Sequence, residues 1–275
     1  MRGLYRNAVD TRSRDASEFL TMQDTSIASA RISKVPEVTL LFWILKIAAT
    51  TLGETAGDAV SMSLGLGYLI GTAIFAAAFA IAVAIQIRAA RFHPFLYWFT
   101  IIATTTVGTT LADFADRSLG IGYAGGSALL LCLLVASLVV WHRTLGTIAV
   151  ASISTPRAEM FYWLTIMFSQ TLGTALGDWT ADSAGLGYTG AMLIFGGLLV
   201  VLAGLYFWTN VSRTALFWAA FVLTRPLGAV VGDFLDKPIE SGGLALSRFA
   251  ASGALLLLIV VCLVVFRQRP ATAAH

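Results

Sequence analysis

The sequence predicts an all-α membrane protein with eight transmembrane helices, arranged as four parallel two-helix repeats. Three observations predict this fold: the chain is strongly apolar, its apolar runs are long enough to cross a bilayer, and one residue pattern occurs four times. Of its 275 residues, 57% are hydrophobic and 12% are charged, and its mean hydropathy is +0.81. Soluble domains carry about 25% charged residues, so water is not the main solvent of this chain.

The apolar runs give the expected helices. The runs 69–86, 127–141, 191–207 and 251–266 are free of charged residues. With its flanks, each run reaches the roughly 20 residues that a helix needs to cross the hydrocarbon core. Polar helices that share the repeat pattern lie between these runs. We therefore expect helices near residues 37–61, 66–90, 94–116, 121–142, 158–181, 186–208, 214–236 and 244–266.

The repeat is defined by a Trp, a Gly and an Asp at fixed intervals. The tryptophans are Trp43, Trp98, Trp163 and Trp218, and an Asp follows each by 15 residues, at Asp58, Asp113, Asp178 and Asp233. A glycine precedes each Asp by five residues, at Gly53, Gly108, Gly173 and Gly228. Fourfold identity at fixed intervals indicates internal duplication. We expect the tryptophans and glycines to serve packing, since small residues let membrane helices approach closely.

The duplication divides the chain into six segments. We expect a polar cytoplasmic tail at 1–36, repeats at 37–91, 92–156, 157–211 and 212–268, and a C-terminal tail at 269–275. Basic residues gather in the N-terminal tail and in alternate loops, whereas the opposite loops hold only Arg117, Lys237 and Arg248. The positive-inside rule therefore predicts that both termini are cytoplasmic. Because each repeat crosses twice, all four run in the same sense.

A polar stripe runs along the first helix of each repeat. In the first repeat Lys46, Thr50, Glu54 and Asp58 recur every four residues and so share one helix face. Polar groups exposed to lipid cost several kcal/mol each, so these helices should line a shared interior. The equivalent polar residues of the other repeats are Thr105, Thr109 and Asp113, then Gln170, Thr174 and Asp178, then Arg225 and Asp233.

The stripe predicts a cation or proton site. The candidate ligands are Glu54, the four repeat aspartates, Thr50, Thr105, Thr109 and Thr174, whose oxygens suit hard cations. Glu54, Asp58 and Asp113 are the expected metal ligands, and Lys46 and Arg225 the charge partners. Arg225 should pair with Glu54 or with an Asp of another repeat. An Asp beside a glycine-rich turn can also cap that turn, so both interpretations of the aspartates stay open.

These features favour a transporter-like protein that binds or moves a divalent metal ion or a proton. The alternative is a non-transporting scaffold or a protein that binds an apolar ligand. No metalloprotease, serine-hydrolase or phosphate-loop motif occurs in the sequence, so we expect no enzyme activity and no cofactor. The expected partners are the lipid bilayer, a small inorganic cation and a further copy of the chain. Nucleic acid is not expected.

Two segments carry a family resemblance. Lys34–Val38 and the stretch 46–68, with Thr-Thr-Leu-Gly-Glu at 50–54, resemble a bacterial family of four-repeat membrane proteins that is labelled a repeat of unknown function. The resemblance extends from about residue 33 to 267 and is weakest in the fourth repeat, where Arg225-Pro226 interrupts the stripe. It implies the repeat architecture and a location in the bacterial inner membrane. It implies no substrate and no catalytic residue.

Overall fold

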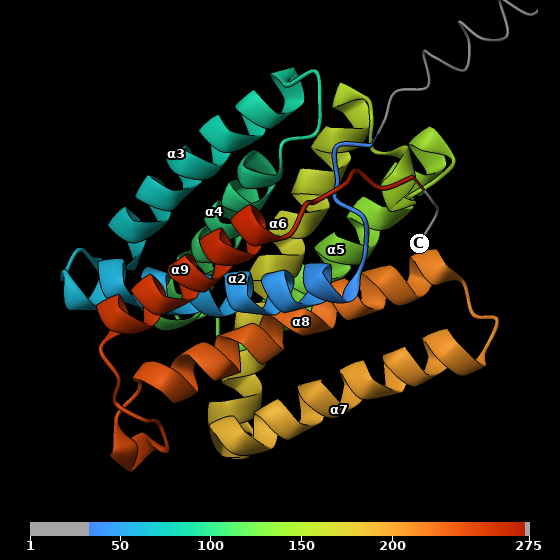
Figure 1. Ribbon diagram of the computed structural model, residues 1–275. Helices are drawn as coiled ribbons and strands as arrows, with labels where there is room; N and C mark the ends of the chain where they lie inside the picture. Colours follow the sequence, from blue (N-terminus) through green and yellow to red (C-terminus); the bar gives the residue numbers. More distant parts are fainter. Residues whose placement is uncertain (1–32, 273–275) are drawn as a thin grey trace, which may run out of the picture. The chain divides into compact units, whose positions relative to one another are not determined.

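The computed structural model describes residues 33–272, and eight long helices account for most of them (Figure 1). No β-strand occurs in this part of the chain, where the one β-bridge joins Pro36 to Pro270. The prediction of an all-helical chain is therefore confirmed. The helices are α2 (Leu40–Asp58), α3 (Gly67–Arg88), α4 (Pro94–Asp113), α5 (Tyr123–Leu145), α6 (Pro156–Asp178), α7 (Gly187–Trp208), α8 (Arg213–Asp236) and α9 (Arg248–Val265).

The repeated glycine-rich turn ends the first helix in three of the four repeats. After α2, α4 and α6 the chain forms a five-residue π-helix and then a Gly-x-Gly turn. The two glycines of each turn have positive φ, for example 68° at Gly65 and 74° at Gly67, which glycine adopts without strain. In the fourth repeat α8 ends at Asp236, and Lys237 and Pro238 follow. That turn is replaced by the short 3₁₀-helix Ile239–Ser241.

The first helices of the four repeats form a closed ring. α2 packs against α4 and α8, and α6 packs against the same two helices. Equivalent positions meet at both ends of the ring. Tyr97 and Tyr162 are hydrogen-bonded through their hydroxyls at 2.6 Å near one end, and Asp113 and Asp178 share a cation near the other. Phe42 and Phe217 of α2 and α8 likewise meet near the first end, and Lys237 contacts Asp58 and Asp233 near the second. Within each of these two pairs the helices are therefore parallel.

The second helix of each repeat packs outside the ring, against the first helix of the next repeat. α3 lies on α4, α5 on α6, and α7 on α8, while α9 closes the cycle by packing on α2. In Figure 1 the red helix α9 accordingly lies beside the blue helix α2, although they come from opposite ends of the described chain. Each repeat is thus held by its neighbour, and the fourth is held by the first.

The repeat glycines make the ring contacts. A Cβ atom added to Gly228 would lie 2.1 Å from Thr50 Oγ1, and one added to Gly173 would lie 2.2 Å from Arg225 Cγ. Gly53 faces Thr105 and Gly108 faces Gln170 in the same way. In every case the glycine contacts a residue of the next repeat, and that residue lies eight positions before the repeat Asp. Only a residue without a side chain allows this approach.

Aromatic residues fill the ring at the opposite end from the aspartates. Phe42, Tyr97, Tyr162 and Phe217 occupy equivalent positions there, and each is at most 3% exposed. Trp98, Trp163 and Trp218 are also buried, whereas Trp43 is only partly buried. The Trp218 indole donates a hydrogen bond to the carbonyl oxygen of Ile148 at 3.1 Å. The tryptophans therefore pack the core.

The outer helices carry an apolar surface. Large side chains on α3, α5, α7 and α9 are exposed, including Leu193 (73%) and Val264 (71%). Within the described residues, six helices are long and apolar enough to cross a membrane: α3, α4, α5, α7, α8 and α9. The ring helices α2 and α6 are not among them. Six candidate spans are thus established, against the eight that the sequence predicts.

Residues 33–36 pack against the helices, although they belong to the expected N-terminal tail 1–36. Lys34 forms an ion pair with Glu159 at the start of α6, with Nζ and Oε1 2.7 Å apart. The same ammonium donates hydrogen bonds to the carbonyl oxygens of Gln86 and Ile87 near the end of α3. Ala271, in the expected C-terminal tail, donates its backbone N–H to Val35. The rest of the expected N-terminal tail, residues 1–32, lies outside the described residues.

We predict that Gly108→Ala destabilises the protein, while Gly197→Ala on α7 does not. The added methyl group at residue 108 would lie 2.9 Å from the backbone carbon of Gln170 and 3.0 Å from the nitrogen of Thr171, whereas no atom lies within 4 Å at residue 197. Overpacking of this kind costs about 1–3 kcal/mol. Thermal unfolding in detergent should therefore show a lower Tm for Gly108→Ala only. Equal Tm values for the two variants would contradict the tight ring contact.

Candidate functional site

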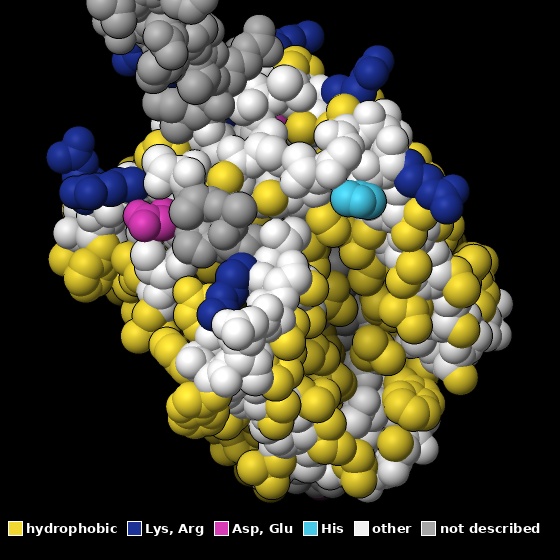
Figure 2. Space-filling model, turned by 90° about the vertical axis from the view of Figure 1, so that its right-hand side faces the viewer, with side chains coloured by type: hydrophobic (Ala, Val, Ile, Leu, Met, Phe, Trp, Pro, Cys, Tyr) yellow, Lys and Arg dark blue, Asp and Glu magenta, His cyan; other side chains and the backbone are white. Residues whose placement is uncertain are grey.

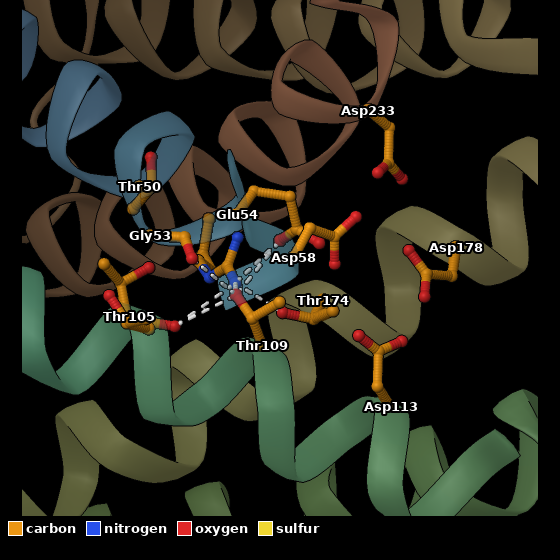
Figure 3. Close-up of polar contacts among 12 residues, drawn as sticks. Thr50, Gly53, Glu54, Asp58, Thr105, Thr109, Asp113, Thr174, Asp178 and Asp233 are labelled. Carbon is orange, nitrogen blue, oxygen red and sulfur yellow. Dashed lines mark hydrogen bonds and ion pairs between the residues drawn. The ribbon is translucent and has the colours of Figure 1, made fainter. Parts of the chain in front are cut away.

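Three buried carboxylates from three repeats meet inside the ring. Oxygen atoms of Glu54 on α2, Asp178 on α6 and Asp233 on α8 all lie within 4.8 Å of one another. Each of the three residues is at most 4% exposed. Figure 3 shows the repeat aspartates gathered on the side of Glu54 away from Thr50. We call Glu54, Asp178 and Asp233 the carboxylate trio.

The trio differs from the metal ligands expected from the sequence. Glu54, Asp58 and Asp113 were expected together, but among the described residues they do not form a group with this spacing. Asp58 instead approaches Asp233 and Asp236 in a second group of three buried carboxylates. The difference arises from the ring, because α2 contacts α8 as closely as it contacts α4. Spacing along one helix does not determine which neighbouring helix supplies a ligand.

Arg225 holds the centre of the site. It is fully buried on α8, and its Nη2 lies 3.0 Å from Glu54 Oε2, one of the partners that the sequence predicts. The same nitrogen donates hydrogen bonds to the hydroxyls of Thr109 on α4, at 2.6 Å, and Thr174 on α6, at 2.5 Å. One guanidinium group thus contacts the other three ring helices. Glu54 is thus the member of the trio that contacts Arg225.

The threonines of the stripe have different roles. Thr109 Oγ1 lies 3.2 Å from Glu54 Oε2, so Thr109 and Thr174 both belong to the site. The Thr50 hydroxyl instead donates to the carbonyl oxygens of Lys46 and Ile47 within its own helix. Thr105 contacts Gly53. Of the four expected threonine ligands, therefore, two reach the Glu54–Arg225 pair through their hydroxyls, whereas Thr105 reaches Arg225 through its carbonyl oxygen, at 3.5 Å.

Lys46 lies apart from the acidic groups. It is fully buried, and its Nζ lies 4.2 Å from the centroid of the Phe221 ring on α8. Among residues 33–272, no carboxylate pairs with it and no acceptor bonds to it. Its partner on a neighbouring helix is thus an aromatic face, which attracts a cation by about 0.5–2 kcal/mol. Lys46 does not pair with Glu54.

The four repeat aspartates form ion pairs, and those of the first three repeats do not cap the turns that follow them. Arg117 joins Asp113 to Asp178, with Nε–Oδ1 at 2.8 Å and Nη2–Oδ2 at 3.3 Å. Lys237 joins Asp58 to Asp233 in the same manner. The aspartates are therefore linked in two pairs, each by one cation.

Lys237 remains charged in this position, just beyond the end of α8. Burial lowers the pKa of its ammonium, but the carboxylates of Asp233 and Asp58 raise it by more, so that the net pKa lies above its ordinary value. Arg248 adds a further contact, with its Nε 2.9 Å from Asp236 Oδ2. From the sequence, Arg117, Lys237 and Arg248 were assigned only to loops. The signal that could have identified two of them is spacing, since Arg117 and Lys237 each follow a repeat Asp by four residues.

This end of the ring carries more negative than positive groups. Its buried carboxylates are Glu54, Asp58, Asp113, Asp178, Asp233 and Asp236, and the cations that contact them are Arg117, Arg225, Lys237 and Arg248. The carboxylates outnumber these cations by two. Each carboxylate has an ion-pair partner, but some cations are shared, so a net negative charge remains in a buried region, where charge is costly. A divalent cation or two protons would remove that excess.

The profile of a family described as Repeat of Unknown Function (DUF347) matches four stretches of the chain: 41–92, 96–147, 161–212 and 216–269. The chain belongs to this family. Each match begins two residues before a repeat Trp, so the predicted family and its four repeats are confirmed. No curated protein and no solved structure matches the chain significantly.

The four DUF347 repeats are unequal at the site. The position of Glu54 holds Thr109, Thr174 and Ala229 in the other repeats, and the position of Arg225 holds Thr50, Thr105 and Gln170. The first repeat therefore supplies the extra carboxylate, and the fourth supplies the buried guanidinium. The fold is pseudo-symmetric, but the site is asymmetric.

We predict that Arg225→Met destabilises the protein more than Glu54→Gln and Arg225→Met together. The single change leaves Glu54 buried without its cation, and breaking a buried pair costs about 3–5 kcal/mol. The double change removes both charges. Denaturation in detergent should give a double-mutant cycle with a favourable coupling energy.

Arg143→Met is the matched control for this cycle, because Arg143 is exposed at the end of α5. It should leave stability within about 0.5 kcal/mol of wild type. Additive effects of Glu54→Gln and Arg225→Met would refute the coupling.

Proposed function

We propose that this DUF347 protein spans the bacterial inner membrane eight times and moves a cation across it, binding the ion at the carboxylate trio. The transported species is either one divalent metal ion or two protons. The observation that carries the proposal is the buried carboxylate trio from three repeats, at an end of the ring where the buried carboxylates outnumber the cations that contact them by two. The alternative, a scaffold that does not transport, would retain the ring but would not require this excess of negative charge.

The ring geometry supports eight spans. α2 and α6 occupy the same ring positions as α4 and α8, which are apolar enough to cross a membrane. At 1.5 Å per residue, the 19 residues of α2 extend about 28 Å, close to the roughly 30 Å hydrocarbon core. The charged residues that lower the hydropathy of α2 are Lys46, Glu54 and Asp58. All three are buried inside the ring, so lipid does not meet them.

The distribution of charge supports cytoplasmic termini. Arg88, Arg91, Arg143, Arg157, Arg267 and Arg269 are exposed at the end of the molecule that carries the described chain ends, and none forms an ion pair with a described residue. Figure 2 faces the connection from α7 to α8 and shows several Lys and Arg side chains with few acidic ones. At the opposite end Arg117, Lys237 and Arg248 are paired with aspartates. Unpaired basic charge thus lies on one side, as the positive-inside rule requires.

The site chemistry favours a hard cation. The trio and the hydroxyls of Thr109 and Thr174 are oxygen ligands, which suit Mg²⁺, Ca²⁺ or Mn²⁺. The three carboxylates come from three ring helices. A movement of one repeat relative to another would therefore change the distances between these carboxylates and hence their affinity for the cation. The aromatic layer of Phe42, Tyr97, Tyr162 and Phe217 closes the ring on the cytoplasmic side of the site. Release to that side would require those rings to move.

We predict that a divalent cation raises the Tm of the metal-stripped protein in detergent. A ligand at 100 times its Kd stabilises the folded state by about 2.7 kcal/mol. The Asp178→Asn variant should have the same Tm with and without the cation, because the substitution removes the charge of one ligand. Asp182→Asn, exposed at the same end of α6, should retain the rise in Tm.

Proteoliposomes loaded with a fluorescent metal or pH indicator test transport with the same variants. Flux in the wild type and in Asp182→Asn, but not in Asp178→Asn, is expected. A wild type whose Tm responds neither to Mg²⁺, Ca²⁺ and Mn²⁺ nor to pH would refute the site. A Tm response without flux would favour a non-transporting protein.

We further predict the sidedness of two loops. In a background with Cys132→Ala and Cys262→Ala, a membrane-impermeant maleimide added to intact spheroplasts should label Leu119→Cys but not Arg91→Cys. Both positions are exposed, and α4 separates them. Permeabilised spheroplasts should show labelling of both. The reverse pattern in intact spheroplasts would invert the orientation, and labelling of both would show that α4 does not span.

A further inference from the structure

We infer that the groove between α3, α5 and α6 binds an anionic phospholipid, with its phosphate on Arg157 and one acyl chain along α6. The groove has a volume of about 680 Å³, within the 300–1,000 Å³ range of small-molecule sites. This inference requires the membrane insertion proposed above. It does not require that the ring bind a cation.

The lining of the groove changes from polar to apolar along its length. Arg157 and Thr144 lie at the cytoplasmic end, where α6 begins and α5 finishes. Deeper along α6 and on α3 the lining is wholly hydrophobic: Met160, Phe161, Trp163, Leu164 and Met167, with Phe79 and Val83 opposite. A phospholipid has the same order, with a charged headgroup at the interface and hydrocarbon below it.

The length of the groove fits one leaflet. From Arg157 to Met167 the lining covers ten residues of α6, or about 15 Å at 1.5 Å per residue. This is half of the roughly 30 Å hydrocarbon core. An acyl chain whose headgroup lies at Arg157 would therefore remain beside α6 for the depth of its leaflet. Met160 (63%) and Leu164 (46%) are exposed within the groove and available for that contact.

Charge complementarity favours an anionic headgroup. Arg157 is exposed and has no ion-pair partner among the described residues, since the neighbouring acid, Glu159, is paired with Lys34. Arg157 also lies in the first turn of α6, where the helix dipole attracts phosphate. The equivalent positions of the other repeats are Glu37, Phe92 and Ser212. Only the third repeat therefore places a cation at this position.

Native mass spectrometry of the full chain, released from mixed micelles, tests the inference. The probes are dioleoyl phosphatidylglycerol and dioleoyl phosphatidylcholine, which share acyl chains and differ in headgroup charge. We expect the wild type to retain one phosphatidylglycerol in preference to phosphatidylcholine. Arg157→Gln should reduce that preference about fivefold, which corresponds to the 1 kcal/mol contributed by one basic residue near an anionic surface.

Two further variants make the test specific. Arg267→Gln removes an exposed basic residue at the same end but outside the groove, so it should leave the preference unchanged. Leu164→Trp fills the apolar part at an exposed position and should lower retention of both lipids while preserving the elution volume of the folded protein.

Equal losses in Arg157→Gln and Arg267→Gln would overturn the inference, because they would show only general attraction to a basic face. Unchanged retention in Leu164→Trp would overturn it as well, since the acyl chain would lie elsewhere. A wild-type dimer that Leu164→Trp dissociates would show that a second copy of the chain occupies the groove. None of these outcomes bears on the cation-dependent Tm, so the two proposals fail independently.

Discussion

The structure depends on the burial of the charged faces of four helices. Glu54, Asp113, Asp178 and Asp233 lie on these helices, two of which, α4 and α8, are also apolar enough to cross a membrane. A ring buries the charged groups, because each helix turns its polar face to the axis. The ring can close tightly because a glycine of each repeat receives a side chain of the next, as Gly228 receives Thr50. The outer helices then cover part of the ring and present their apolar residues outward.

Duplication explains the ring, and divergence explains the site. Four identical repeats would place four identical groups at each level of the axis. Instead, Glu54 replaces a threonine or alanine, and Arg225 replaces a threonine or glutamine at the neighbouring level. The two changes meet, with Arg225 Nη2 3.0 Å from Glu54 Oε2. The fourth repeat also replaces the glycine-rich turn with a segment that begins at Lys237, which provides the cation for Asp58 and Asp233.

Periodicity in the sequence predicted the helices, the repeats and the polar face, because each follows from spacing along one chain. The 15-residue interval from Trp43 to Asp58 locates a complete helix without knowledge of its neighbours. The way the ring closes determines which helices are neighbours. Spacing along the chain therefore could not show that Glu54 lies close to Asp178 and Asp233. The contacts of residues in loops were harder still to predict. Arg117 lies beyond the helix in the sequence, yet its side chain returns to Asp113 and crosses to Asp178.

The ion pairs divide the acidic end of the ring into two halves. Arg117 links α4 to α6, and Lys237 links α8 to α2. Arg225 strengthens the second half through Glu54, and it contacts the first half through the hydroxyls of Thr109 and Thr174 and the carbonyl oxygen of Thr105. The carboxylate trio takes Asp178 from the first half and the other two ligands from the second. If a cation binds there, as proposed, it would join the two halves through three carboxylates. The spacing of the halves would then depend on occupancy of the site, as the proposed transport requires.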